Sequence, residues 1–184
     1  DVHSAQIQGY FDIPCDHIYG SPVLIDYLET LDLEEIVVVS PDVGGVARAR
    51  AFAKLMKDAP LAIIDKRRSA HNIAESLTVI GEVKGKTAIL IDDMIDTGGT
   101  ICSGANLLKK EGANRIFACA SHAVFSPPSY ERLSSKNLFE QVIVTNSIPV
   151  IHKDNFPQLK VLSVANMLGE AIWRIHEESS VSSM

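Results

Sequence analysis

The stretch ILIDDMIDTGGT, residues 89–100, decides which fold this chain is expected to adopt. Its first residues belong to an apolar run with the length of a buried strand, TAILI at 87–91, and its last residues open a helical segment, ICSGANLLKKEG at 101–112. An apolar strand followed by an amphipathic helix is typical of a parallel sheet with crossover helices. The stretch therefore predicts an α/β fold.

The same pattern of strand and helix recurs on both sides of this stretch. Further strands are expected where short apolar or β-branched runs occur, at 36–40, 61–65, 115–121, 141–147 and 160–164. Helices are expected in the Ala-rich segment at 46–58, after Pro127, and at 166–178. By contrast, KRRSAHN at 66–72 begins with three adjacent cations and has few apolar side chains, so we expect a loop there.

Length and composition limit the classes of protein to which the chain can belong. A chain of 184 residues suits one compact α/β domain, and 46% hydrophobic with 22% charged residues is an ordinary globular composition. The net charge of −6 argues against nucleic acid or an anionic membrane as the main partner. The 3 cysteines show no CxxC spacing, so neither a zinc site nor disulfides are indicated. No run approaches the roughly 18 apolar residues that span a bilayer.

Acidic and glycine-rich residues follow the strand at 87–91, where an open parallel sheet binds its ligands. The turn TGGT at 97–100 can direct backbone N–H groups, two hydroxyl groups and the positive end of a helix at a phosphate. Asp92 and Asp93 supply carboxylates that accept hydrogen bonds from ribose hydroxyls or bind a hydrated metal. Together these groups indicate a ribose phosphate as ligand. In the alternative interpretation, Asp96 only caps the helix and the two glycines form a tight turn.

ILIDDMIDTGGT resembles the ribose 5-phosphate loop that type I phosphoribosyltransferases share with ribose-phosphate pyrophosphokinases, also called phosphoribosyl pyrophosphate synthetases. Four other segments resemble the pyrophosphokinases, in the same order along the chain: DVHSAQIQGYFDIPCDH, VVSPDVGGVARARAFA, IDKRRSAHN and VTNSIPV. The resemblance runs from Asp1 to the tail SSVSSM. It implies a three-layer α/β domain with a parallel sheet, of the type I phosphoribosyltransferase kind.

The resemblance also implies that the chain is the carboxyl-terminal part of a longer enzyme whose first half is a second α/β domain. Residues 1–18 are then a junction segment, and residues 19–165 form the phosphoribosyltransferase-like domain. Residues 166–184 form a terminal helix and tail that pack on the other domain. The family forms hexamers or related oligomers, so we expect a homo-oligomer. The expected compartment is the cytoplasm, with a plastid as the alternative.

The activity implied by the resemblance is transfer of the β,γ-diphosphoryl group of ATP, with Mg²⁺, to the 1-hydroxyl of ribose 5-phosphate, giving phosphoribosyl pyrophosphate and AMP. Lys66 and Arg68 match the family's catalytic-loop cations, which stabilise charge on the transferring group. Without the resemblance, the run KRR is equally well explained as a solvated surface turn. The residues matched to sugar-phosphate binding are Asp92, Asp93, Asp96, Thr97, Gly98, Gly99, Thr100 and Arg68.

His3 and Asp42 match positions associated with magnesium in the family, where the metal also takes ATP oxygens and water. Because His is an unusual magnesium ligand, a contact of His3 with the nucleotide phosphates is the second interpretation. For Asp42, the loop alone slightly favours a helix N-cap. The remaining histidines of interest have no convergent partner in the sequence and are expected to be structural: His71, His122, His152 and His176.

Two other functions stand as alternatives. A catalytically silent, synthetase-associated regulatory subunit would keep the fold and lose the chemistry, but DDMIDTGGT, Lys66 and Arg68 are intact. A phosphoribosyltransferase that consumes phosphoribosyl pyrophosphate would share the ribose loop without explaining His3 or the segment QIQGYFDIP. In the family, part of each active site comes from the other domain and from a neighbouring subunit. We therefore expect this chain to bind ribose 5-phosphate with little turnover.

Overall fold

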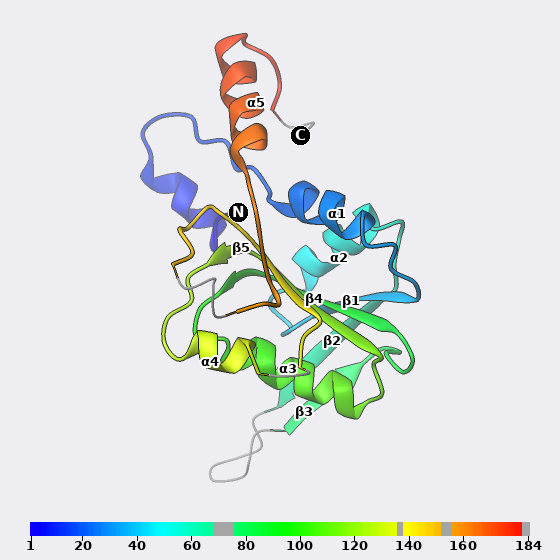
Figure 1. Cartoon of the computed structure of the whole chain (residues 1–184). Coiled ribbons are helices and arrows are strands. Elements are labelled where there is room, and N and C mark those ends of the chain that lie inside the picture. The colour runs from blue at the N-terminus through cyan, green and yellow to red at the C-terminus, as the bar shows by residue number, and fades with distance from the viewer. Residues whose placement is uncertain (68–75, 136–137, 152–155, 182–184) are drawn as a thin grey trace.

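A computed structural model of the chain describes residues 1–67, 76–135, 138–151 and 156–181. Within these residues, one seven-stranded sheet has helices packed on both faces (Figure 1). The strands are β1 (Ile36–Ser40), β2 (Leu61–Arg67), β3 (Ser76–Ile80), β4 (Thr87–Ile95), β5 (Arg115–Ala123), β6 (Gln141–Thr145) and β7 (Leu159–Leu162). The helices are η1 (Ala5–Tyr10), α1 (Ser21–Glu29), α2 (Val46–Leu55), α3 (Gly99–Lys110), α4 (Ser129–Leu133) and α5 (Ala165–His176).

The sheet is parallel apart from one edge. Its strand order is β3-β2-β1-β4-β5-β6-β7, and only β2 and β3 pair antiparallel. The chain moves outward from β1 to β2 and β3, and then returns to place β4 on the other side of β1. Open α/β sheets bind ligands where the strand order reverses in this way, beyond the carboxyl ends of the strands. The carboxyl ends of β1 and β4 therefore mark the expected ligand position.

Alternate side chains of the central strands divide the core between the two faces of the sheet. Val37 and Val39 of β1 pack in one cluster with residues of α3, whereas Val38 packs in a second cluster with residues of α1 and α2. All three valines are fully buried. A strand covered on both faces has an unbroken apolar sequence, which explains why runs such as IVVV were recognisable. The predicted three-layer α/β fold is confirmed.

Two strands extend further than the sequence pattern predicts. β4 continues to Ile95, so Asp92 and Asp93 lie within the strand and not after it. β2 continues to Arg67 and pairs with β3, so the prediction of a loop was wrong for Lys66 and Arg67. The reason is long-range, because pairing with a neighbouring strand satisfies the backbone hydrogen bonds of even a charged segment.

The helix α1 was not predicted from the sequence pattern. It begins at Ser21 with a proline in its first turn, where the fixed φ of proline suits a helix. Leu24, Ile25 and Leu28 are its buried residues, and they belong to the same core cluster as Val38. Its only polar residues are Ser21, Asp26 and Glu29, and these are too few to mark a polar face with a helical period in the sequence alone.

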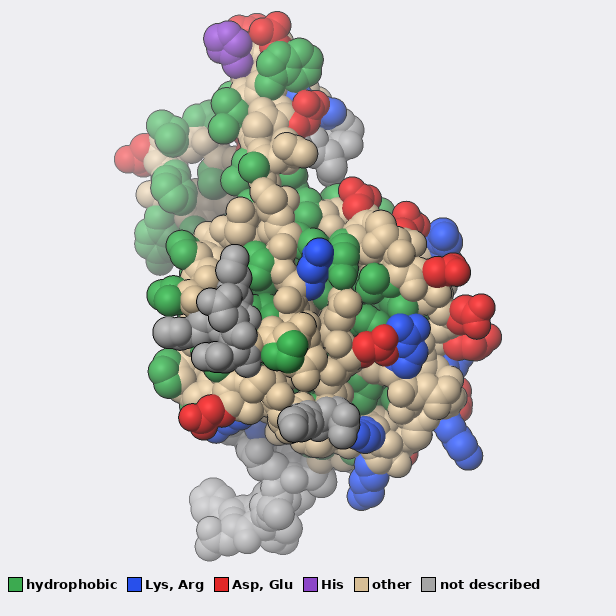
Figure 2. Space-filling model, in the orientation of Figure 1, with side chains coloured by type: hydrophobic (Ala, Val, Ile, Leu, Met, Phe, Trp, Pro, Cys, Tyr) green, Lys and Arg blue, Asp and Glu red, His purple; other side chains and the backbone are tan. Residues whose placement is uncertain are grey.

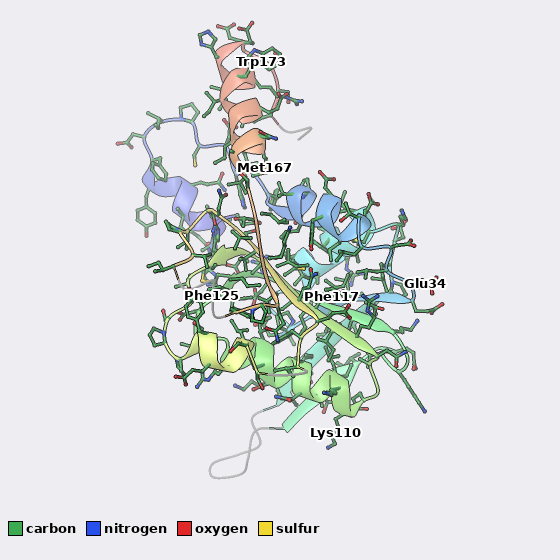
Figure 3. All side chains as sticks on the ribbon, viewed as in Figure 1. Glu34, Lys110, Phe117, Phe125, Met167 and Trp173 are labelled. Atoms are coloured by element: carbon green, nitrogen blue, oxygen red, sulfur yellow. The ribbon has the colours of Figure 1, made fainter. Side chains whose placement is uncertain are left out.

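The helices η1 and α5 lie apart from the two covered faces of the sheet, and α5 extends from the top of the molecule in Figure 1. No residue of η1 and only Ala171 of α5 is buried. Figure 2 shows apolar side chains gathered over this region, which we call the η1/α5 surface, and its exposed members include Ile7, Tyr10, Leu168, Ile172, Trp173 and Ile175. Figure 3 shows that Trp173 lies on the protruding α5, where it is exposed, whereas Phe117 lies inside the body of the domain, where it is buried. Among the described residues, no helix has the length and apolar character to cross a membrane.

Candidate functional site

The glycine-rich turn at 97–100 lies against the short helix α4. Gly98 directly precedes α3 and has a left-handed backbone with a φ of +73°. A Cβ atom at this position would lie 3.3 Å from Cγ of the buried Leu133. Glycine suits this position because L-residues are strained at such a φ. Behind the turn, Nη1 of Arg132 donates a hydrogen bond to the carbonyl oxygen of Thr97, 3.1 Å away.

A cavity of about 230 Å³ adjoins this turn. Asp96, Thr97 and Thr100 are exposed, so their polar groups can reach a ligand. The first N–H groups of α3 lack partners within the helix and favour an anion. Gly98 precedes the helix and no side chain forms a cap hydrogen bond there, so the alternative role of Asp96 as helix cap is not observed. The cavity is lined by Asp92, Met94, Ile95, Asp96, Thr97, Gly98, Gly99, Thr100 and Ile101.

The sequence pattern did not single out Arg48, the cation that neutralises the two aspartates of β4. Its Nη1 atom lies 3.1 Å from Oδ1 of Asp92, and its Nη2 atom lies 3.2 Å from Oδ1 of Asp93. Arg48 belongs to α2, the helix after β1, and therefore reaches β4 across the point where the strand order reverses. Asp93 is 2% exposed, and a carboxylate so deeply buried requires a paired charge. Arg48 allows two adjacent acids to stand at this edge.

The two carboxyl groups have different surroundings. Burial raises the pKa of Asp92 to about 7, and the hydrogen bond and negative charge of Asp93 act in the same direction. Burial also acts to raise the pKa of Asp93, but hydrogen bonds from Asp92 and His3 and the charge of Arg48 outweigh it and lower that pKa. The surroundings therefore favour a proton on Asp92 and the ionised form of Asp93.

The opening segment brings His3 to this pair from 90 residues away in the sequence. Nδ1 of His3 lies 2.7 Å from Oδ2 of Asp93. Since an ionised carboxylate can only accept, Nδ1 carries the proton of this hydrogen bond. The His3 side chain is 70% exposed against 3% for that of Asp93, so most of the ring is accessible to a ligand. A histidine that binds a metal through one nitrogen commonly donates the other N–H to a carboxylate, as His3 does.

The other predicted site residues have separate positions. Asp42 follows β1 and is exposed, and its Oδ1 atom accepts a hydrogen bond of 2.8 Å from the backbone N–H of Gly45, directly before α2. The residue that caps α2 is Gly45, so a role of Asp42 as the helix N-cap is not observed, and its contact closes the turn before the helix. Lys66 is exposed near the end of β2. Arg68 lies outside the described residues.

The metal prediction depends on His3 and Asp42. In the part of the chain that the structure describes, no group of three or more His, Cys, Asp or Glu side chains could hold a metal ion. Magnesium is often bound by one or two carboxylates with substrate phosphates and water completing the shell. The described residues are therefore suited to share a metal with a phosphate ligand, and not to enclose one alone.

The architecture defines a three-layer α/β domain of the type I phosphoribosyltransferase kind. This class is shared by an adenine phosphoribosyl transferase from Trypanosoma brucei, with a TM-score of 0.51 at 15% identity over 78% of this chain and 62% of that one. The family model of the phosphoribosyl synthetase-associated domain matches residues 68–184. The chain belongs to this family.

Two closer relatives agree with the family assignment. The chain is 94% identical to the ribose-phosphate pyrophosphokinase of Prochlorococcus marinus subsp. pastoris over 184 residues, which is 100% of this chain and 56% of the relative. It also matches the crystal structure of phosphoribosylpyrophosphate synthetase from Mycobacterium smegmatis at 44% identity and a TM-score of 0.87, over 97% of this chain and 58% of that one. The chain spans about half the length of the curated relatives it matches. The predicted family and fold class are confirmed.

Proposed function

We propose that this chain carries the ribose 5-phosphate site of a ribose-phosphate diphosphokinase. One observation carries the proposal: a single cavity joins the phosphate turn at 97–100 to Asp92, and the contacts of Arg48, Asp93 and His3 stand directly beside it. Relatives named ribose-phosphate pyrophosphokinase support the same activity. The substrates are ribose 5-phosphate and ATP.

The main binding contacts of ribose 5-phosphate are with its negatively charged 5-phosphate group. Backbone N–H groups at the start of α3, together with the hydroxyl groups of Thr97 and Thr100, hold the 5-phosphate. Asp92 and Asp96 accept hydrogen bonds from the ribose hydroxyls. Asp93, whose two oxygens already contact Arg48 and His3, supports these groups from behind. The sugar is thereby oriented with its 1-hydroxyl toward the nucleotide.

In the transfer step, the oxygen of the 1-hydroxyl forms a bond to the β-phosphorus of ATP. The bond from that phosphorus to the bridging oxygen of the α-phosphate breaks, the hydroxyl proton is lost to the surroundings, and AMP leaves. Such a transfer depends mainly on positioning and charge neutralisation. Lys66 and Arg68 neutralise the transferring group.

Magnesium, when bound, neutralises the charge of the ATP phosphates. His3 and Asp42 would hold it together with ATP oxygens and water. The fit of His3 rests on its hydrogen bond to Asp93, which fixes the ring and leaves the side chain 70% exposed. The fit of Asp42 rests on its exposed position after β1, at the edge that carries Asp92.

The surroundings of the chain are part of the same proposal. The exposed η1/α5 surface would pack on the first half of a protein as long as the curated relatives, with residues 1–18 as the junction segment, 19–165 as the catalytic domain and 166–184 as the contact. A homo-oligomer, a hexamer as in the family, completes each active site in the cytoplasm. The chain alone then binds ribose 5-phosphate with little turnover.

The test combines binding and turnover. Calorimetry on this chain should show binding of ribose 5-phosphate and not of ribose, and Asp96→Ala should weaken that binding about tenfold. Asp26→Ala, at an exposed residue of α1, is the matched control for the lost charge. Phosphorus NMR on a protein of the relatives' full length should then show AMP and phosphoribosyl pyrophosphate formed from MgATP.

Each contrary result points to a different function. If ribose 5-phosphate binds while ATP stays intact, the chain is not part of an active enzyme and the regulatory-subunit function is supported instead. Pyrophosphate release from phosphoribosyl pyrophosphate on adding a nucleobase would identify a phosphoribosyltransferase.

A further inference from the structure

We propose that Ser121 and His122 position His3 for the nucleotide by holding Asp1, two residues before it, on strand β5. We call the group Asp1, Gly20, Ser121 and His122 the clasp. The role of His3 in binding the nucleotide rests on the proposed function. The contacts of the clasp are observed independently of it. His122, which the sequence suggested to be only structural, is here a positioning residue.

The carboxylate of Asp1 closes the opening segment into a loop. Its Oδ2 atom accepts hydrogen bonds from the backbone N–H of Gly20, at 2.9 Å, and from the hydroxyl of Ser121. The backbone nitrogen of Asp1 donates to the carbonyl oxygen of Ile18 at 2.8 Å. Ser121 is 5% exposed, so its hydroxyl meets the carboxylate where water hardly competes. The two ends of residues 1–20 therefore lie on the carboxyl end of β5.

His122 holds the backbone of Asp1 from the other side. Its Nε2 atom lies 2.7 Å from the carbonyl oxygen of Asp1, and its Nδ1 atom lies 2.8 Å from Oγ of Ser147, beyond β6. Because a carbonyl oxygen can only accept, Nε2 carries the proton. Both ring nitrogens are thus engaged, and the ring has one orientation.

The register of the sheet explains why this clasp places His3 at Asp93. In the pairing of β4 with β5, Asp92 lies opposite Ala120 and Met94 lies opposite His122. The clasp on β5 is therefore directly beside the aspartates of β4. His3 follows Asp1 by two residues and reaches Asp93 through one hydrogen bond of 2.7 Å. The hydrogen bond to Asp93 orients the exposed His3 ring, while the clasp sets the place of the backbone that carries it.

A positioning role predicts a change confined to the nucleotide side of the reaction. Loss of a group that orients a metal- or phosphate-binding side chain typically costs about 10- to 100-fold in activity. The phosphate turn at 97–100 belongs to a different strand–helix unit, and so its affinity for ribose 5-phosphate should stay unchanged. A general loss of folding would instead weaken both.

The experiment uses Ser121→Ala and His122→Gln, with His176→Gln on the exposed side of α5 as the matched histidine control. In this chain, NMR of the histidine rings should show the His3 signals shifted in both variants and unchanged in the control. Calorimetry should give a ribose 5-phosphate affinity within about twofold of the parent. In a protein of the relatives' full length, kcat/KM for MgATP should fall about tenfold.

Gly20→Ala tests the clasp without removing any hydrogen-bonding group. A Cβ atom at Gly20 would lie 2.7 Å from Oγ of Ser121 and 3.1 Å from Oδ2 of Asp1, so the clasp must open. The same shift of His3 signals is expected. Unchanged His3 signals in folded variants, or an equal loss of ribose 5-phosphate affinity, would overturn the proposal. A parent chain that does not bind ribose 5-phosphate would refute the proposed function, while the His3 signals still decide the clasp.

Discussion

The proposed phosphate turn at 97–100 and the cluster of His3, Asp93 and Arg48, which we call the His3 junction, lie at the same edge of the sheet, but they are built in opposite ways. The turn is four contiguous residues, 97–100, which lead from β4 into the first residues of α3, and α4 packs behind it. The junction joins His3 to Asp93 across 90 residues and requires Arg48 from a third element. Under the proposed function, recognition of a fixed phosphate charge is therefore a property of one strand–helix unit. The balance of charge beside it is a property of the whole sheet edge.

This difference determines how each region should fail. A change in the turn alters the shape that is proposed to bind phosphate, so its main effect should be on the affinity for the ligand. A change at the junction leaves a buried carboxylate without a partner, so it should act on the free energy of unfolding as well. The following variants separate the two regions.

The largest effect is expected for Gly98→Ala. A non-glycine residue at a φ of +73° is strained by about 1–2 kcal/mol, and the added Cβ meets Leu133 at 3.3 Å. This strain, with about 1–3 kcal/mol for overpacking, should drive the turn into another shape, so ribose 5-phosphate should bind about 100-fold more weakly, as measured by calorimetry. Gly169→Ala is the control because a Cβ at that position meets nothing within 4 Å. Equal affinity of Gly98→Ala and the parent would show that the left-handed turn is not needed.

The second variant, Arg48→Met, removes the cation of the junction. It leaves Asp92 and Asp93 without their ion pairs, of which Asp93 is the more buried. The free energy of unfolding should fall by about 1–3 kcal/mol near neutral pH, measured by urea denaturation. Arg50→Met, an exposed arginine of the same helix, is the matched control. Equal stabilities of the two variants would contradict the neutralising role of Arg48.

The third variant, Asp92→Asn, tests the pKa of about 7 that burial gives to Asp92. An unfolded Asp has a pKa of about 3.9, so the folded state binds more protons between roughly pH 4 and pH 7. The contribution of Asp92 to stability is therefore complete below the unfolded pKa and is lost as the pH rises through the folded pKa. Between about pH 4 and pH 8, Asp92→Asn should gain about 1–3 kcal/mol relative to the parent.

Urea denaturation across that pH range checks the sign of this effect. Asp26→Asn on α1 is the matched control, and its stability should follow the parent at every pH. A stability difference between Asp92→Asn and the parent that does not change with pH would contradict the raised pKa. Calorimetry should also show weaker binding of ribose 5-phosphate by Asp92→Asn, since the variant loses an acceptor for the sugar hydroxyls.

The sequence predicts features that one continuous stretch of residues forms, and it misses features that form only when distant segments come together. β1 and β4 could be recognised because strands buried on both faces have unbroken apolar sequences, and residues 97–100 because one stretch contains the whole turn. The pairing of β2 with β3 depends on backbone partners, to which KRR gives no clue. Arg48 was missed because its role depends on α2 lying beside β4. The signal was an arginine in the first turn of the helix after β1, but an ordinary surface helix carries the same signal.

The smallest effect is expected for Arg132→Met, which removes the support of the turn from behind. Its guanidinium donates one exposed hydrogen bond to the carbonyl oxygen of Thr97, and a bond of this kind contributes about 1 kcal/mol. Ribose 5-phosphate should therefore bind about fivefold more weakly, with the free energy of unfolding nearly unchanged. Arg132→Lys, which keeps the charge and one donor, should restore part of the affinity.

Lys110→Met is the control for the lost charge, because Lys110 is the last residue of α3, at the far end from the turn, and is exposed (Figure 3). If both variants weaken binding equally, the effect is one of net charge and not of the hydrogen bond to Thr97. If Arg132→Met leaves binding unchanged, the turn keeps its shape through its own backbone and the packing of Gly98 on Leu133. The shape of the turn would then depend on even fewer other residues, whereas the His3 junction depends on three separate segments of the chain.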